Sequence, residues 1–276
     1  MHSHILIGIH GLANKPPREA LAAGWKAAIE EGLRKNEKVA GYEINFQMVY
    51  WADVLYDTPD EDPENRYREA APGALKTYED SWWDDVRAGA FDLAGDVLDA
   101  LKRYFGMDAA AEHFLGERLK DLARYYQDRN IRETLRERLK QAILDHQDKR
   151  IMLLSHSMGT IIAYDVLRQL GRRHPRLAID HFVTLGSPLG LPHVKYRISR
   201  EQPPVRTPSI VRRWSNFADR RDPVAADVHL AGDYEPNASG VAPEDDLVAN
   251  DWGGLHHKSY GYLRAPEVSR TIRRFL

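Results

Sequence analysis

A serine at position 157 lies where a short apolar run gives way to a stretch with helical spacing. Residues 151–154 are all apolar, which predicts a strand buried on both faces. Apolar side chains then recur from Ile161 to Leu170 at the spacing of a helix face. A serine on such a strand-to-helix turn presents its hydroxyl, which becomes a nucleophile when a base takes its proton. The chemistry this predicts is attack on an ester or a related acyl bond.

The neighbours of Ser157 are small at the two positions where a sharp turn needs it. A strand and a helix can approach this closely only when the residues two positions before and two after the serine are small. Ser155 and Gly159 meet that condition, although the usual pattern has glycine at both positions. Serine is small enough to replace glycine here, and the start of a helix favours developing negative charge. The local sequence therefore supports Ser157 as a nucleophile.

Four separated segments resemble the α/β-hydrolase superfamily, particularly its lipase and esterase branches. Residues 9–12 resemble the His-Gly segment that follows an early strand and supplies an oxyanion donor. Residues 155–159 resemble the nucleophile elbow, residues 183–188 a strand-end segment common in lipases, and residues 257–260 the segment around the catalytic histidine. The resemblance spans almost the whole chain and implies the order nucleophile, acid, histidine.

A serine nucleophile needs a base, and the base needs an orienting acid. Both His256 and His257 come late enough in the chain, and the resemblance favours His257 because Ser259 and a tyrosine follow it. For the acid, the resemblance points to Asp222, with Asp219 as the competitor; either carboxylate could instead pair with a neighbouring arginine. We therefore expect a triad of Ser157, His257 and Asp222, with His256 and Asp219 as the alternatives.

Two backbone N–H groups are expected to stabilise the oxyanion of the tetrahedral intermediate. Met158, directly after the nucleophile, supplies one. Leu12, after His10 and Gly11, supplies the other, and glycine at position 11 lets the backbone approach the substrate closely. The predicted oxyanion hole is thus made of Leu12 and Met158.

The elements that position these residues alternate between strands and helices along most of the chain. Strands are predicted at residues 5–9, 43–51, 151–154, 181–185 and 210–217, with helices over residues 21–33, 131–143, 157–173 and 266–276. This alternation predicts an α/β fold: an α/β-hydrolase domain spanning residues 1–276, its mostly parallel sheet covered by helices on both faces.

Residues 53–130 interrupt this alternation. A polar, proline-punctuated loop comes first, and two amphipathic patterns that carry several aromatic residues follow it. We expect a helical insertion that forms a cap over Ser157, although the same aromatic residues would also serve as the core of the insertion or as an oligomer interface.

Composition limits the partners and the location. The net charge of −2 provides no overall field for nucleic acid, and the absence of cysteine excludes disulfides and a cysteine nucleophile. His2 and His4 alternate along the first strand, but two histidines do not make a metal site, so we expect no metal and no cofactor. No apolar run reaches the roughly 20 residues that span a bilayer, and the first residues do not have the pattern expected of a secretory signal. We expect a cytoplasmic protein without a transmembrane segment; the oligomeric state stays open.

The favoured function is a serine hydrolase acting on a small-molecule ester or acyl substrate through an acyl-Ser157 intermediate. An acyltransferase or thioesterase would use the same residues with another acceptor or leaving group. The alternative from a different class is a non-catalytic relative that binds a small molecule or a protein with the same fold. The serine, the late histidine and the oxyanion segment are all present, which favours the enzyme.

Overall fold

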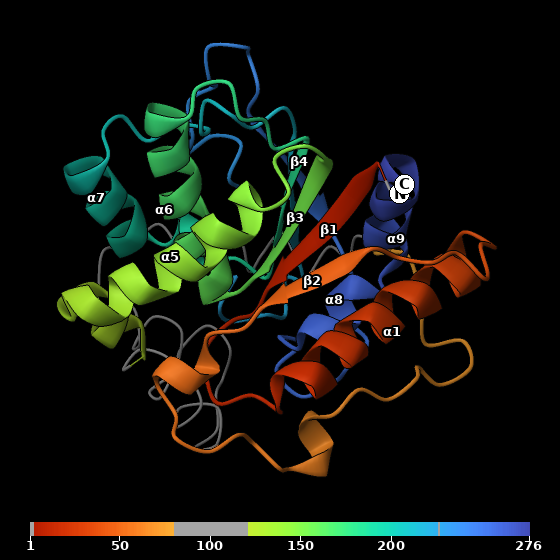
Figure 1. Ribbon diagram of the computed structural model, residues 1–276. Coiled ribbons are helices and arrows are strands. Elements are labelled where there is room, and N and C mark those ends of the chain that lie inside the picture. Colours follow the sequence, from red (N-terminus) through yellow and green to blue (C-terminus); the bar gives the residue numbers. More distant parts are fainter. Residues whose placement is uncertain (1–2, 80–120, 226) are drawn as a thin grey trace.

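The computed structural model describes residues 3–79, 121–225 and 227–276 (Figure 1). Six parallel strands form one sheet in the order β2-β1-β3-β4-β5-β6. The strands are β1 (His4–Ile9), β2 (Phe46–Val49), β3 (Arg150–His156), β4 (His181–Leu185), β5 (Trp214–Ala218) and β6 (Pro243–Leu247).

Helices cover both faces of the sheet (Figure 1). One face carries α5 (Arg129–Leu144), α6 (Met158–Arg173) and α7 (Pro192–Glu201), and the other carries α1 (Arg18–Asn36), α8 (Ser259–Leu263) and α9 (Pro266–Phe275). Short 3₁₀ turns are η1 (Ala52–Val54), η2 (Pro63–Asn65) and η3 (Pro188–Gly190). In these three stretches of chain, every helix is too short or too polar to span a bilayer.

The strand pleat divides the core into two hydrophobic clusters. Ile7 and Leu153 face the cluster that contains α5, α6 and α7, whereas Leu6 and Leu154 face the cluster that contains α1, α8 and α9. Successive residues of a strand point to opposite faces, so a strand covered by helices on both sides must be apolar at every position. This requirement explains the continuous apolar runs that mark β1 and β3 in the sequence.

The α/β prediction is confirmed, with differences at several elements. The strand expected over residues 43–51 is reduced to β2, and the one expected over residues 210–217 begins at Trp214. Neither β6, α7 nor α8 was expected. The sequence of β6 contains three acidic residues, and as the last strand in the sheet order it leaves every position after Pro243 at least partly exposed. An edge strand of this kind has no apolar run to reveal it.

The expected helical insertion lies mostly outside the described residues, because residues 80–120 belong to it. Of its described part, residues 53–79 contain only η2 and the end of η1, and residues 121–127 are helical. A cap over Ser157 therefore stays a prediction, as does the division of the chain into domains.

A buried ionic cluster ties α1 to the chain that follows β6. Glu31 of α1 accepts hydrogen bonds from Lys35 Nζ (2.6 Å), the Tyr67 hydroxyl (2.9 Å) and Arg264 Nη1 (3.1 Å). Arg264 also binds both carboxylate oxygens of Asp251, each at 2.8 Å. Burial raises the pKa of Glu31, but the hydrogen bonds and the nearby cations outweigh it, so the pKa lies below its ordinary value of 4.5. Glu31 is therefore ionised and holds these segments together.

Replacing Glu31 with glutamine is expected to lower the free energy of unfolding by about 3 kcal/mol, because buried Arg264 would lose a charged partner. The folded pKa of Glu31 is depressed, so its stabilisation is complete above about pH 4.5 and is lost as pH falls through the folded pKa. Urea denaturation between pH 3 and pH 7 measures both effects. The control is Glu30→Gln, which removes an exposed pair with Lys26 and should change stability by about 0.5 kcal/mol at most. Equal losses in the two variants would contradict the role given to Glu31.

Candidate active site

Ser157 occupies a strained turn between β3 and α6. Its backbone angles are φ 55° and ψ −132°, a region that non-glycine residues rarely adopt. Its N–H donates to the carbonyl of Leu185 (3.0 Å), and its carbonyl accepts from the N–H (2.9 Å) and hydroxyl (2.7 Å) of Thr160. Such conformations persist only where surrounding bonds enforce them. These bonds fix Ser157 at the end of the sheet.

Two glycines allow the turn to form. A Cβ on Gly159 would lie 2.6 Å from the carbonyl oxygen of His10 and 2.7 Å from that of Ile9. A Cβ on Gly11 would lie 3.0 Å from Ser157 Oγ and would also overlap the Ser157 Cβ. The first turn of α6 therefore packs directly on the end of β1, and any side chain at either position would force the two apart.

Ser155, which replaces the usual glycine, is accommodated by a hydrogen bond. Its hydroxyl is fully buried and donates to the carbonyl of Val183 at 2.7 Å. A buried hydroxyl without a partner would be costly, whereas this one is satisfied within the sheet. The departure from the glycine pattern is thus compatible with the turn.

His257 lies between Ser157 and Asp222. Its Nε2 is 2.9 Å from Ser157 Oγ, and its Nδ1 is 2.6 Å from Asp222 Oδ2. A carboxylate only accepts hydrogen bonds, so Nδ1 carries the proton and Nε2 is left to accept the proton of the serine. The three side chains are at most 3% exposed. They come from loops at the ends of β3, β5 and β6 and form one continuous hydrogen-bonded series.

Asp222 is held by two further donors. The backbone N–H of Val224 donates to Oδ1 at 2.9 Å, and the hydroxyl of Tyr262 donates to Oδ2 at 2.7 Å. Burial, followed by the nearby charges of Asp222 and Asp219, raises the pKa of Tyr262 well above its ordinary value, so the phenol stays protonated. Tyr262 was not among the residues predicted from sequence, and it is five positions after His257.

The alternatives Asp219 and His256 lie elsewhere. Asp219 accepts hydrogen bonds from the backbone N–H of Asn250 (2.7 Å) and from the side chain of Arg221 (2.7 and 3.0 Å). The Nδ1 of His256 lies 2.9 Å from the carbonyl oxygen of Asn250, so His256 is engaged with the backbone of its own loop. The residues that the structure brings together with Ser157 are therefore His257 and Asp222.

His10 shapes the segment that carries Leu12. Its ring stacks on Trp51 at 4.5 Å, its Nε2 accepts from the Trp51 backbone N–H (2.9 Å), and its Nδ1 lies 2.9 Å from the carbonyl of Gly11. Burial, with a smaller contribution from Lys15, lowers the pKa of His10 well below its ordinary value. The neutral ring with its proton on Nδ1 therefore donates to the Gly11 carbonyl and fixes the peptide that bears the Leu12 N–H.

The other expected oxyanion donor, Met158, is the first residue of α6. The N–H groups of a first helical turn have no partner within the helix, and the helix dipole makes them attractive to negative charge. Leu12 follows the end of β1. Gly11, which lies between β1 and Leu12 in the sequence, packs against Ser157. Both expected donors thus belong to segments that meet at Ser157.

A cleft of about 880 Å³ opens beside His257. Leu12, His156, Trp252, His257 and Tyr260 are among the residues that line it. Four residues from the described part of the insertion also line it, which are Asp60, Glu64, Asn65 and Arg68. Its volume suits a small organic substrate. Among the described residues, no three His, Asp or Glu side chains come together as a metal-binding group.

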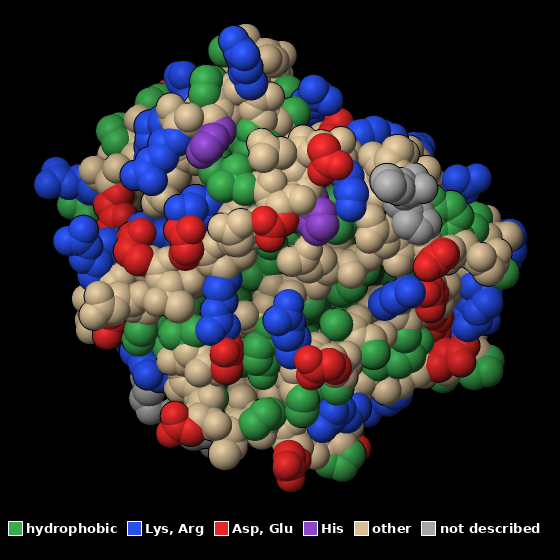
Figure 2. Space-filling view, viewed as in Figure 1, with side chains coloured by type: hydrophobic (Ala, Val, Ile, Leu, Met, Phe, Trp, Pro, Cys, Tyr) green, Lys and Arg blue, Asp and Glu red, His purple; other side chains and the backbone are tan. Residues whose placement is uncertain are grey.

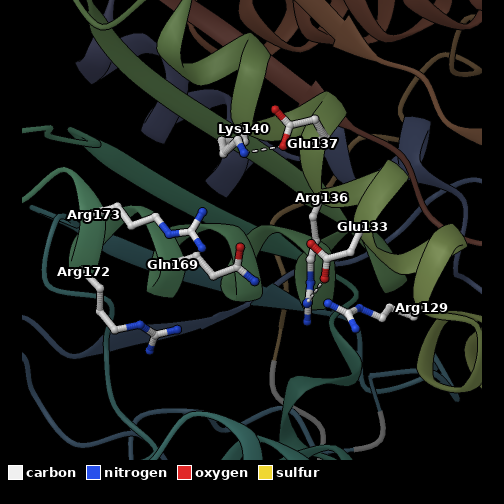
Figure 3. A pocket seen from close by; sticks show the side chains of 8 residues that line it. All are labelled: Arg129, Glu133, Arg136, Glu137, Lys140, Gln169, Arg172 and Arg173. Atoms are coloured by element: carbon white, nitrogen blue, oxygen red, sulfur yellow. Dashed lines mark hydrogen bonds and ion pairs between the residues drawn. The ribbon is translucent and has the colours of Figure 1, made fainter.

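A second hollow of about 330 Å³ lies between α5 and α6 (Figure 3). Its lining is mainly charged, and two of its cations are paired: Arg136 with Glu133 at 3.0 Å and Lys140 with Glu137. It contains no serine, histidine or aspartate. Of these two hollows, the one beside His257 is therefore better suited to acyl chemistry.

Charges are mixed over the visible surface. Figure 2 shows Lys and Arg side chains interspersed with Asp and Glu on this face. Arg206 forms an ion pair with Glu235, and Arg213 forms one with Glu244.

One family model matches the chain: "alpha/beta hydrolase of unknown function (DUF900)", over residues 110–188. The matched segment contains β3, Ser157 and β4, and thus the centre of the sheet and the strained turn. A search of curated proteins finds no match. The family match and the six-stranded parallel sheet together identify an α/β-hydrolase fold.

Two substitutions that both remove the Ser157 hydroxyl should differ in stability. Glycine tolerates φ 55° without a Cβ clash, so Ser157→Gly is expected to be more stable than Ser157→Ala by about 1 kcal/mol. Chemical denaturation of the purified variants measures the difference. Ser199, within helix α7, is the control, because glycine there should be less stable than alanine by about 1 kcal/mol. The same order at both sites would argue against strain at Ser157.

Proposed function

We propose that the protein is a serine hydrolase that cleaves a carboxylic ester, or a related acyl bond, through an acyl-Ser157 intermediate. One observation carries the proposal: the hydrogen-bonded series from Ser157 Oγ to His257 Nε2 and from His257 Nδ1 to Asp222 Oδ2. Two further features support the proposal: the strained turn at Ser157 between β3 and α6, and the cleft that is lined by His257.

In the first half of the reaction, Ser157 Oγ attacks the acyl carbon as His257 Nε2 takes the serine proton. The oxyanion that forms accepts hydrogen bonds from the N–H groups of Leu12 and Met158, and the imidazolium is stabilised by Asp222. When the bond from carbon to the leaving group breaks, His257 returns its proton to the departing alcohol. This leaves the acyl group esterified to Ser157.

In the second half, water occupies the place of the alcohol. His257 takes a proton from the water, the resulting hydroxide attacks the acyl carbon, and the tetrahedral intermediate forms again. Its collapse breaks the bond to Ser157 Oγ, which recovers its proton from His257. The carboxylic acid leaves and the side chains return to their initial protonation states.

Labelling by a fluorophosphonate probe tests the nucleophile directly. The native protein should be labelled on the peptide that contains Ser157, and Ser157→Ala should not be labelled, since only an activated serine attacks phosphorus. Ser199→Ala, which removes a serine hydroxyl in α7 that bonds the Tyr196 carbonyl, is the control and should label like the native protein. A folded native protein that takes no label would argue for a binding protein of the same fold.

Two aspartate variants separate the acid from its neighbour. Asp222→Asn should lower kcat for an activated ester on the order of 10³–10⁴-fold, because the amide would no longer hold His257 in the required tautomer. Asp219→Asn should lower stability, since Asp219 accepts from Asn250 and Arg221, while kcat stays within about tenfold of the native value. Steady-state kinetics with thermal denaturation measures both. A larger loss of kcat in Asp219→Asn would reverse the assignment.

A further inference from the structure

The hydroxyl of Tyr262 lies against the loop after β5, which carries both Asp219 and Asp222. It donates to Asp222 Oδ2 at 2.7 Å, the same oxygen that lies 2.6 Å from His257 Nδ1. It also accepts the backbone N–H of Asp219 at 3.1 Å. A phenol has one proton to donate, and here that proton has a single carboxylate oxygen as its acceptor. Asp222 Oδ2 therefore receives two hydrogen bonds, one from the base and one from Tyr262.

The surroundings leave this contact little freedom. Tyr262 and Asp222 are both fully buried. Gly186, with φ 53°, lies against them, and a Cβ there would come within 2.7 Å of Asp222 Oδ2 and 2.9 Å of the Tyr262 ring. The tight packing holds the phenol and the carboxylate in one arrangement, so the bond between them is a fixed part of the site.

Two effects on Asp222 follow from this bond, one electrostatic and one conformational. A hydrogen bond to a carboxylate disperses its negative charge, and it also restricts rotation of the side chain. Asp222 in turn stabilises the protonated form of His257 by its charge. The strength of the hydrogen bond from Tyr262 therefore affects how strongly Asp222 stabilises the imidazolium that forms when His257 takes the serine proton.

We propose that Tyr262 is a positioning residue of the active site, which fixes Asp222 and tunes, through Asp222, the proton affinity of His257. The catalytic part of this inference rests on the proposed function, whereas the effect on His257 does not require turnover. The titratable or charged groups near the pair include Asp219, its partner Arg221, and His156, whose ring lies 4.7 Å from that of His257 and 6.0 Å from that of Tyr262. The Tyr262→Phe variant leaves all of these side chains in place.

Tyr262→Phe removes only the hydroxyl. Its kcat is expected to fall on the order of tenfold with KM within about twofold, because Asp222 is less well held. The acid limb of the kcat/KM profile should move up by about half a pH unit, because the charge concentrated on Asp222 favours protonated His257. The ring resonances of His257, assigned by comparison with His257→Ala, should titrate at a correspondingly higher pH in NMR spectra.

The matched control is Tyr234→Phe, which deletes another buried hydroxyl, one that donates to the Leu189 carbonyl at 2.9 Å. Its free energy of unfolding should fall about as much as that of Tyr262→Phe, while kcat and the titration of His257 stay unchanged. As a second variant, 3-fluorotyrosine at position 262 keeps the hydroxyl as a stronger donor and should lower the pH at which His257 titrates. An unchanged His257 titration in both Tyr262 variants would overturn the proposal. Failure of the proposed function would appear separately, as a native protein that takes no fluorophosphonate while His257 still responds.

Discussion

The site depends on one close contact, between the first turn of α6 and the end of β1. Gly159 reaches within van der Waals distance of the carbonyls of Ile9 and His10, and Gly11 lies against Ser157. Parallel strands side by side end at the same edge of the sheet, so their loops meet there. The strain at Ser157 and the proximity of Leu12 and Met158 all follow from this approach of helix to strand.

Around that contact, the loops after β5 and β6 are braced by a small number of buried polar groups. Asp219 binds the chain at Asn250, and His156 donates through Nε2 to the carbonyl of His257. Asp251, through Arg264, ties the same loop to α1. Asp222 and the backbone of His257 are thus each held by a side chain from a distant part of the sequence, Tyr262 and His156 respectively, which helps to make a site built from loops rigid.

The sequence predicted those parts of the fold that have a local pattern. Strands β1 and β3 contain continuous apolar runs because both of their faces are covered, and the turn at Ser157 needs small neighbours close by in sequence. Strand β6 was not predicted, because it is acidic and is the last strand in the sheet order, so it has no apolar run. The choices between Asp219 and Asp222, and between His256 and His257, depend on loop paths that no periodicity encodes. Tyr262 was missed for the same reason, and the catalytic roles themselves stay predictions.

The first strand and the last helix meet. The ring of His4 in β1 packs edge-on against Phe275 of α9, with centroids 5.9 Å apart, and Arg150 of β3 lies over the same phenylalanine ring at 4.8 Å. Figure 1 shows the start of β1 and the end of α9 side by side. A short linker could therefore join these ends, and the chain could be opened at the exposed residues 57–59 instead. The fold thus lends itself to circular permutation without disturbing the strand order.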